Sequence, residues 1–197
     1  MVKPAQPDLF GDPAAPAPAG PPGLGYWPDV LSAQMERSVV AQIEPLPLSP
    51  FEFQGYFGNR RTVYFGYGYD YQRGEVREAA PLPDWLLALR GTVAAATGDP
   101  ADAFVQALVT EYAPGAGIGW HRDRPQFGVV AGVSLLAPAS LRFRSKRGEG
   151  WERIAAAIAP RSVYRLSGEA RHGWQHSIAP MKALRYSVTF RTLANGG

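Results

Sequence analysis

The segment LVTEYAPGAGIGWHRD, residues 108–123, decides the prediction of fold and chemistry, because a β-like run ends there in a histidine and a carboxylate two residues apart. On an extended backbone the side chains of residues i and i+2 point to the same face, so His121 and Asp123 can converge on one metal ion while Arg122 points away. Two nitrogens and one oxygen on one face of an octahedron suit non-heme Fe(II), so a second histidine is needed. Downstream, the chain offers His172 and His176.

A second informative segment is RYSVTFR, residues 185–191. Its alternation predicts a strand with Tyr186, Val188 and Phe190 on one face. The opposite face then carries Arg185, Ser187, Thr189 and Arg191. Two arginines on one side of a strand favour an anionic partner, and a guanidinium binds a carboxylate of a small dicarboxylic acid through two hydrogen bonds.

Taken together, His121-Arg122-Asp123, His176 and residues 185–191 resemble the signature of the AlkB-type Fe(II)/2-oxoglutarate-dependent dioxygenases, over about residues 53–192. The resemblance implies that Fe(II) is held by His121, Asp123 and His176. The resemblance implies that His172 supports the site or lies at the surface, because the spacing to residues 185–191 fits His176 better.

The same resemblance assigns the residues that bind the co-substrate. It implies that Arg185 binds the distal carboxylate of 2-oxoglutarate, and that Arg191 lies close to the metal and assists both the co-substrate and the triad. Tyr112 occupies the position of a co-substrate tyrosine. Many relatives have asparagines where this chain has Thr110 and Ser187, and each of these still offers a hydroxyl for hydrogen bonding.

The activity implied by the resemblance is oxidative demethylation of N-alkylated bases in DNA or RNA. O2 and 2-oxoglutarate would yield succinate and CO2, and a hydroxylated N-methyl group would leave as formaldehyde. Pro125 stands where some DNA-repair relatives carry an acidic residue that contacts the base, so the alkylated base stays open. Two alternatives stay open as well: a same-fold oxygenase acting on a protein or small molecule, and a non-catalytic nucleic-acid-binding β-roll.

Residues 51–75 alternate aromatic side chains with glycine and arginine, and the family resemblance implies that this region forms a lid over the substrate. Rings spaced two residues apart can stack an extruded base, and neighbouring arginines can contact phosphates. The expected substrate residues are Tyr67, Tyr69, Tyr71, Arg60 and Arg61. The alternative for any one of these rings is burial within a sheet.

Composition limits the remaining possibilities. With 197 residues, 46% of them hydrophobic, we expect a single domain over residues 26–197, preceded by a disordered tail rich in Pro, Ala and Gly over residues 1–25. No apolar run of membrane-spanning length and no secretory signal pattern is present, so the expectation is a cytoplasmic protein without a membrane partner. A net charge of +3 permits an alkylated, single-stranded nucleic acid as partner without requiring it. We expect a monomer.

The order of elements predicts the fold class. One helix is expected after a cap at Pro28-Asp29, ending before Pro45, and a second from Pro83-Asp84 to Gly98. Strands are expected at residues 104–112, 129–136, 141–145, 151–158, 161–166 and 185–191. This pattern predicts an α+β protein with a two-sheet β-roll core, residues 104–192, and supporting helices on one side. The family resemblance implies that this core is a double-stranded β-helix (jelly roll).

Overall fold

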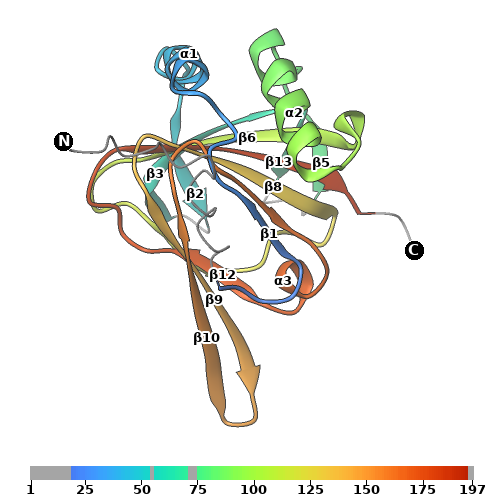
Figure 1. Ribbon diagram of the computed structural model, residues 1–197, viewed down its shortest axis with the longest axis vertical. Coiled ribbons are helices and arrows are strands. Elements are labelled where there is room, and N and C mark those ends of the chain that lie inside the picture. Colours follow the sequence, from blue (N-terminus) through green and yellow to red (C-terminus); the bar gives the residue numbers. More distant parts are fainter. Residues whose placement is uncertain (1–18, 54–55, 71–74, 195–197) are drawn as a thin grey trace, which may run out of the picture.

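The computed structural model describes residues 19–53, 56–70 and 75–194 (Figure 1). Tyr71 and most of the predicted tail, residues 1–18, lie outside the described residues. Strand β1 (Leu24–Trp27) begins two residues before the expected domain start at residue 26, because Leu24 and Gly25 already pair with β11 (Val163–Leu166). The last two residues of the predicted tail thus belong to a strand at the edge of a sheet.

Two antiparallel sheets form the core, as the sequence predicted. The larger sheet has seven strands in the order β1, β11 (Val163–Leu166), β8 (Phe127–Leu135), β13 (Arg185–Leu193), β6 (Phe104–Tyr112), β3 (Tyr56–Phe65) and β2 (Ser49–Phe53). The smaller sheet has four, in the order β10 (Gly150–Ile158), β9 (Ala139–Arg147), β12 (Gln175–Ile178) and β7 (Ile118–His121). The predicted α+β class with a double-stranded β-helix core is confirmed.

Helix α1 (Ala33–Ile43) starts later than the sequence analysis expected. The helix is capped by Ser32, whose side chain accepts a hydrogen bond from the Met35 backbone N–H at 3.1 Å. Asp29 adopts a left-handed φ of 48° and pairs with Arg161 at 3.0 Å. The cap prediction at Pro28-Asp29 is therefore wrong, because Asp29 lies in a turn and the serine offers the capping oxygen.

Helix α2 (Asp84–Thr97) ends at Gly98, whose φ of 78° is the left-handed conformation expected of a glycine that terminates a helix. In Figure 1, α1 and α2 lie together on one side of the larger sheet. A short helix, α3 (Gly168–His172), precedes β12 and was not predicted. No helix among the described residues combines the length and the apolar character needed to span a bilayer.

Apolar side chains form two clusters, one on each face of the larger sheet. The cluster beneath α1 and α2 receives Tyr186, Val188 and Phe190 from β13, together with Ile43 and Leu86 from the helices. The second cluster lies between the sheets and is built from residues such as Leu141, Phe143, Trp174 and Ile178. The alternation of β13 therefore directs Arg185 and Arg191 away from the helices, toward the space between the sheets.

The described part of residues 51–75, the predicted lid, belongs to two different sheets. Strands β2 and β3 extend the larger sheet, where β3 pairs with β6. Strands β4 (Tyr67–Asp70) and β5 (Glu75–Glu78) form a two-stranded ribbon of their own. The lid over the substrate, predicted for residues 51–75, stays a prediction.

Candidate metal centre and co-substrate pocket

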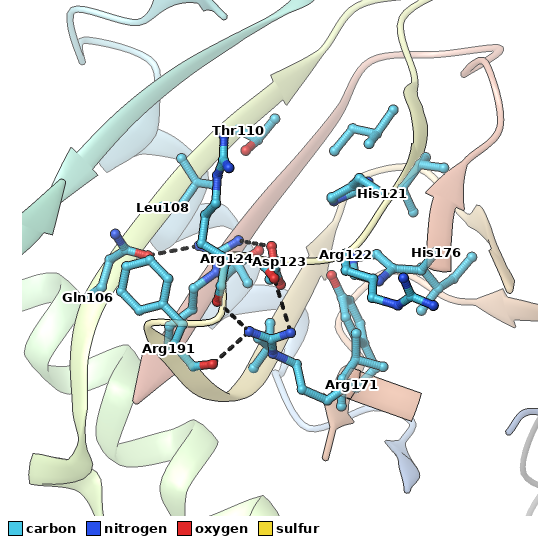
Figure 2. A pocket seen from close by; sticks show the side chains of 18 of the residues that line it. Gln106, Leu108, Thr110, His121, Arg122, Asp123, Arg124, Arg171, His176 and Arg191 are labelled. Atoms are coloured by element: carbon cyan, nitrogen blue, oxygen red, sulfur yellow. Dashed lines mark hydrogen bonds and ion pairs between the residues drawn. The ribbon is translucent and has the colours of Figure 1, made fainter. Parts of the chain in front are cut away.

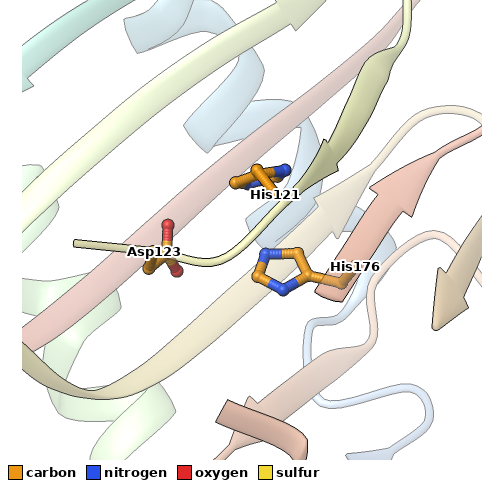
Figure 3. Close-up of side chains that lie close together, drawn as sticks. All are labelled: His121, Asp123 and His176. Atoms are coloured by element: carbon orange, nitrogen blue, oxygen red, sulfur yellow. The ribbon is translucent and has the colours of Figure 1, made fainter. Parts of the chain in front are cut away.

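Three side chains from two strands and a loop meet between the sheets (Figure 3). His121 is the last residue of β7 and pairs directly with His176 of β12, with ring centroids 4.3 Å apart. Asp123 follows two residues later, beyond the end of the strand. One ligand atom from each of the three lies within 4.8 Å of the others. This is the predicted set of two histidines and one carboxylate, and it leaves other positions around an ion open.

Hydrogen bonding prepares His121 for a metal. Its Nδ1 lies 2.9 Å from the backbone carbonyl oxygen of Gly119, so Nδ1 carries the proton and Nε2 is free to coordinate. His176 is buried, and within the part of the chain that the structure describes its Nδ1 has no hydrogen-bond partner. Burial, reinforced by the neighbouring His121, lowers the pKa of His176 to about 3. Burial also lowers the pKa of His121. Both rings are therefore neutral, the form that binds metal.

Asp123 is held as a carboxylate by a buried arginine (Figure 2). Arg191 Nη2 donates to Asp123 Oδ1 at 3.2 Å, and Arg191 Nη1 donates to Gln106 Oε1 at 3.0 Å. Burial by itself raises the pKa of Asp123, but the positive charge of Arg191 outweighs this effect and holds the pKa well below its ordinary value. The site therefore keeps one negative ligand beside two neutral ones.

The backbone that carries Asp123 is fixed by Arg171 of α3 (Figure 2). This guanidinium is buried and donates to four carbonyl oxygens, those of Asp123 (3.2 Å), Arg124 (2.7 Å), Phe127 (2.6 Å) and Gly128 (2.8 Å). Four acceptors spread over six residues hold the loop between β7 and β8 in one shape. Arg171 thereby determines where the Asp123 carboxylate lies relative to the two histidines.

Arg185, the first residue of β13, is only 1% exposed. Its Nε donates to Ser134 Oγ at 3.1 Å, and its guanidinium carbon lies 5.1 Å from the centre of the Tyr112 ring. Nη1 and Nη2 are buried and have no hydrogen-bond partner among the described residues. Burial of a guanidinium with two unpaired nitrogens costs free energy unless an anion binds it. A carboxylate can accept hydrogen bonds from both nitrogens at once.

A cavity of about 830 Å³ lies between the sheets, next to the three ligands. Of the predicted site residues, it is lined by Thr110, Tyr112, His121, Asp123, His176, Arg191 and Arg60. Ser187 is buried and pairs with Thr110 across the sheet, outside the lining. His172 is exposed and lies at the edge of the cavity, in agreement with a role other than that of ligand.

Among the predicted substrate residues whose side chains the structure describes, only Arg60 lines the cavity. Arg61 points to the opposite sheet face from Arg60 and binds Glu111 through two hydrogen bonds of 2.7 Å, which corrects its expected position beside the substrate. The backbone oxygen of Tyr67 accepts a hydrogen bond from Gln106 at 2.6 Å, which ties the β4–β5 ribbon to the site. Tyr69 lies in the same ribbon.

Sequence reasoning missed four residues that shape the site: Gln106, Ser134, Tyr164 and Arg171. Gln106 shares the alternation of Leu108, Thr110 and Tyr112 along β6, so period-two spacing could have revealed it. Ser134 contacts Arg185, and buried Tyr164 lines the cavity. Nothing in the sequence around Arg171 signals four contacts to backbone oxygens.

The chain is similar to known proteins in both sequence and fold. A family model described as the 2OG-Fe(II) oxygenase superfamily matches residues 31–191. The tRNA (carboxymethyluridine(34)-5-O)-methyltransferase alkbh8 of Xenopus tropicalis is 29% identical over 84% of this chain and 26% of its own length. The alkylated DNA repair protein ALKBH8 homolog of Arabidopsis thaliana is 24% identical over 80% of this chain and 51% of its own length. The chain thus spans about a quarter to a half of these two relatives.

Two solved structures share the fold. The structure of OsALKBH1 superposes with a TM-score of 0.69 at 14% identity, covering 90% of this chain and all of that one (100%). A prolyl-4-hydroxylase of Pseudomonas putida superposes with a TM-score of 0.59 at 17% identity, covering 88% of this chain and 94% of that one. At these low identities, the two superpositions show a shared fold and nothing more.

Proposed function

Because this chain belongs to the 2OG-Fe(II) oxygenase superfamily, in its AlkB-like branch, we propose that it oxidatively demethylates N-alkylated bases in DNA or RNA. One observation carries the oxygenase chemistry: His121, Asp123 and His176 line one cavity together with Arg191. Arg185, at the start of the same strand, lies outside this lining and is buried, and two of its three guanidinium nitrogens lack partners among the described residues. The cofactors of such a site are Fe(II) and 2-oxoglutarate, with O2 as the oxidant.

The residues present fit these cofactors. His121, Asp123 and His176 would hold Fe(II) through two imidazole nitrogens and one carboxylate oxygen, a set that suits this ion. Arg185 would bind the distal carboxylate of 2-oxoglutarate through the two Nη atoms that otherwise lack partners. When bound, Fe(II) with O2 and 2-oxoglutarate supplies the oxidising power that hydroxylates a C–H bond.

The chain's own residues orient and insulate this chemistry. Arg191 keeps Asp123 ionised and is itself positioned by Gln106, so the carboxylate has one orientation. Tyr112 and Thr110 add hydroxyl groups to the co-substrate side of the cavity. Leu108, Leu141 and Ile178 give the cavity apolar walls that exclude water. Hydroxylation of an N-methyl group leaves a hemiaminal, whose C–N bond breaks to release formaldehyde and restore the N–H bond.

Support for a nucleic acid substrate comes from the cavity mouth and from the relatives. Arg60, Arg122 and Arg124 line the cavity together with Tyr64 and Trp120, a mixture of cations and rings that suits phosphate and base. The two curated relatives carry names that refer to tRNA and to alkylated DNA. Pro125 also lines the cavity, and its side chain cannot accept a hydrogen bond from an exocyclic amino group. Recognition of an exocyclic amino group would need another residue, so the proposal leaves the alkylated base open.

The test is to load the protein with Fe(II) and 2-oxoglutarate without oxygen, add a panel of N-methylated DNA and RNA oligonucleotides, and admit air. We expect one methyl group to be lost from at least one oligonucleotide, with formaldehyde and succinate formed in equal amounts. Asp123→Ala serves as the inactive control. If 2-oxoglutarate is consumed but no oligonucleotide loses mass, the substrate is of another class, and methyl loss without succinate would overturn the chemistry.

A further inference from the structure

The outward face of the four-stranded sheet has a composition that the oxygenase chemistry does not use. Alternation along β9 turns Leu141 and Phe143 inward and leaves Arg142, Arg144 and Lys146 on the outside. Pairing across the sheet then places further residues on the same outer face: Trp151 opposite Lys146, Arg153 opposite Arg144, Gln175 opposite Arg144, and Ser177 opposite Arg142. Trp120 joins them from β7, one residue before the inward-facing His121. We refer to these residues as the basic-aromatic face.

Cations and indole rings alternate across this face. The guanidinium carbon of Arg144 lies 4.7 Å from the centre of the Trp120 ring and 4.3 Å from that of Trp151. Arg142 lies 5.3 Å from Trp120, and Lys146 Nζ lies 5.7 Å from Trp151. Stacking against rings holds these long side chains flat on the sheet, so less conformational freedom remains to be lost when a ligand binds.

Each stacked arginine is also anchored through a single nitrogen. Arg144 Nε donates to Gln175 Oε1 at 2.7 Å, and Arg142 Nε donates to Ser177 Oγ at 3.1 Å. Within the described chain, their Nη atoms have no protein acceptor, and they are not buried. Two oriented guanidinium groups thus present free donors to solvent, an arrangement suited to phosphate oxygens.

The charge on this face has one sign. Its outward residues include four cations, Arg142, Arg144, Lys146 and Arg153, and no carboxylate. The acidic residue of the same hairpin, Glu152, pairs with Arg147 at 2.9 Å on the reverse face. The whole chain has a formal net charge of only +3, so this face concentrates positive charge.

We propose that the basic-aromatic face is a docking surface for the single-stranded segment of nucleic acid that flanks the target base. Arg142, Arg144 and Arg153 bind phosphates, and Trp151, which is 37% exposed, stacks a base. Trp120 connects this surface to the active site, because it also lines the cavity. In Figure 1 the β9–β10 hairpin projects well beyond the body of the molecule, which lengthens the surface available to a strand. The inference rests on the proposed function and adds the path that the nucleic acid strand takes over the protein surface.

The test measures binding of a labelled single strand of about 15 nucleotides with one N-methylated base, by fluorescence anisotropy at several salt concentrations. The Fe(II)- and 2-oxoglutarate-loaded protein is compared with Arg144→Gln, Arg153→Gln and Trp151→Ala. We expect each arginine variant to reduce the slope of log Kd against log salt by about 0.7, the value for one phosphate contact on a single strand. We expect Trp151→Ala to weaken binding at least about fivefold.

The matched control is Arg147→Gln, which removes the same charge from the reverse face of the same hairpin. It should keep the wild-type salt slope. If it lowers the slope as much as Arg144→Gln does, net charge rather than this face governs binding, and the proposal is overturned. The proposal is also overturned if all three face variants bind the oligonucleotide as the wild type does and the wild type still demethylates it. If the wild-type protein binds no oligonucleotide, the proposed function fails as well.

Discussion

The two faces of the four-stranded sheet place nitrogen-bearing side chains in opposite environments, although neighbouring residues supply both. His121 and His176 point inward to Asp123, where burial lowers the pKa of His176 to about 3. Trp120 and Gln175, each one residue earlier, point outward to solvated arginines. Charge on the inner face acts through short contacts in a medium of low dielectric constant, whereas charge on the outer face is screened by water and salt.

This difference orders the effects expected of substitutions. Removing one inner group leaves buried partners unsatisfied, and the loss is large and specific. Removing one outer cation changes one contact among several, and the loss is small and depends on salt.

The largest effect is expected for the metal ligands. Replacing His121, Asp123 or His176 by Ala should abolish Fe(II) binding and reduce succinate formation by at least about 100-fold, since the loss of a mere supporting partner of a metal ligand already reaches that size. Anaerobic Fe(II) titration and succinate assays measure both effects. His172→Ala is the control, because His172 is exposed and should retain iron. Equal loss of iron in His172→Ala and His176→Ala would show that the third ligand is misassigned.

The buried guanidinium of Arg185 should act in opposite directions on stability and on binding. Arg185→Met removes an incompletely satisfied buried charge, so we expect the cofactor-free protein to unfold about 2–4 °C higher for each kcal/mol recovered. The same variant should bind 2-oxoglutarate about 10- to 100-fold more weakly, because two charge-assisted hydrogen bonds are lost. Thermal unfolding with and without 2-oxoglutarate measures both.

Arg165→Met is the matched control for that variant. Arg165 already has a full partner, since Nε and Nη2 each donate to Asp99 at 2.7 Å. Its loss should lower the unfolding temperature and leave the stabilisation by 2-oxoglutarate intact. A lower unfolding temperature for cofactor-free Arg185→Met would mean that Tyr112 and Ser134 already compensate the buried charge.

A smaller effect is expected at Arg171. Arg171→Lys keeps the charge but replaces a planar group that reaches four carbonyl oxygens by a single ammonium. We expect Fe(II) to bind about 10-fold more weakly, because the loop that carries Asp123 loses its fixed shape. Arg90→Lys is the control, since Arg90 reaches one carbonyl oxygen, that of Phe104 at 3.3 Å, away from the metal ligands. Unchanged iron affinity in Arg171→Lys would remove its positioning role.

The features predictable from sequence are those determined by local periodicity. Alternation placed the two arginines of β13 on the face opposite Tyr186, Val188 and Phe190, and a terminating glycine ended α2 at Gly98. Both depend on the nature of the peptide backbone and need no knowledge of distant partners.

The features that sequence reasoning missed depend on partners far along the chain. Arg171 acts on carbonyl oxygens more than 40 residues away. Ser32 caps α1, whereas Asp29 pairs with the distant Arg161. Arg60 and Arg61 were treated alike, although adjacent residues of a strand must face opposite sides. Only the pairing of β3 with β6 shows which of the two faces the cavity.

The smallest effect that we expect of any substitution distinguishes Arg60 from Arg61. Arg60 pairs with Tyr112 and lines the cavity, whereas Arg61 pairs with Glu111 on the reverse face. Arg60→Gln should weaken oligonucleotide binding and reduce the salt slope by about 0.7, the value for one phosphate contact. Arg61→Gln should leave the slope unchanged and cost at most about 1 kcal/mol of stability, because Arg61 is half exposed and its ion pair is screened. Salt titrations of both variants decide the matter: a reduced slope in Arg61→Gln alone would mean that the substrate strand crosses the reverse face of the sheet and that the mouth of the cavity is misplaced.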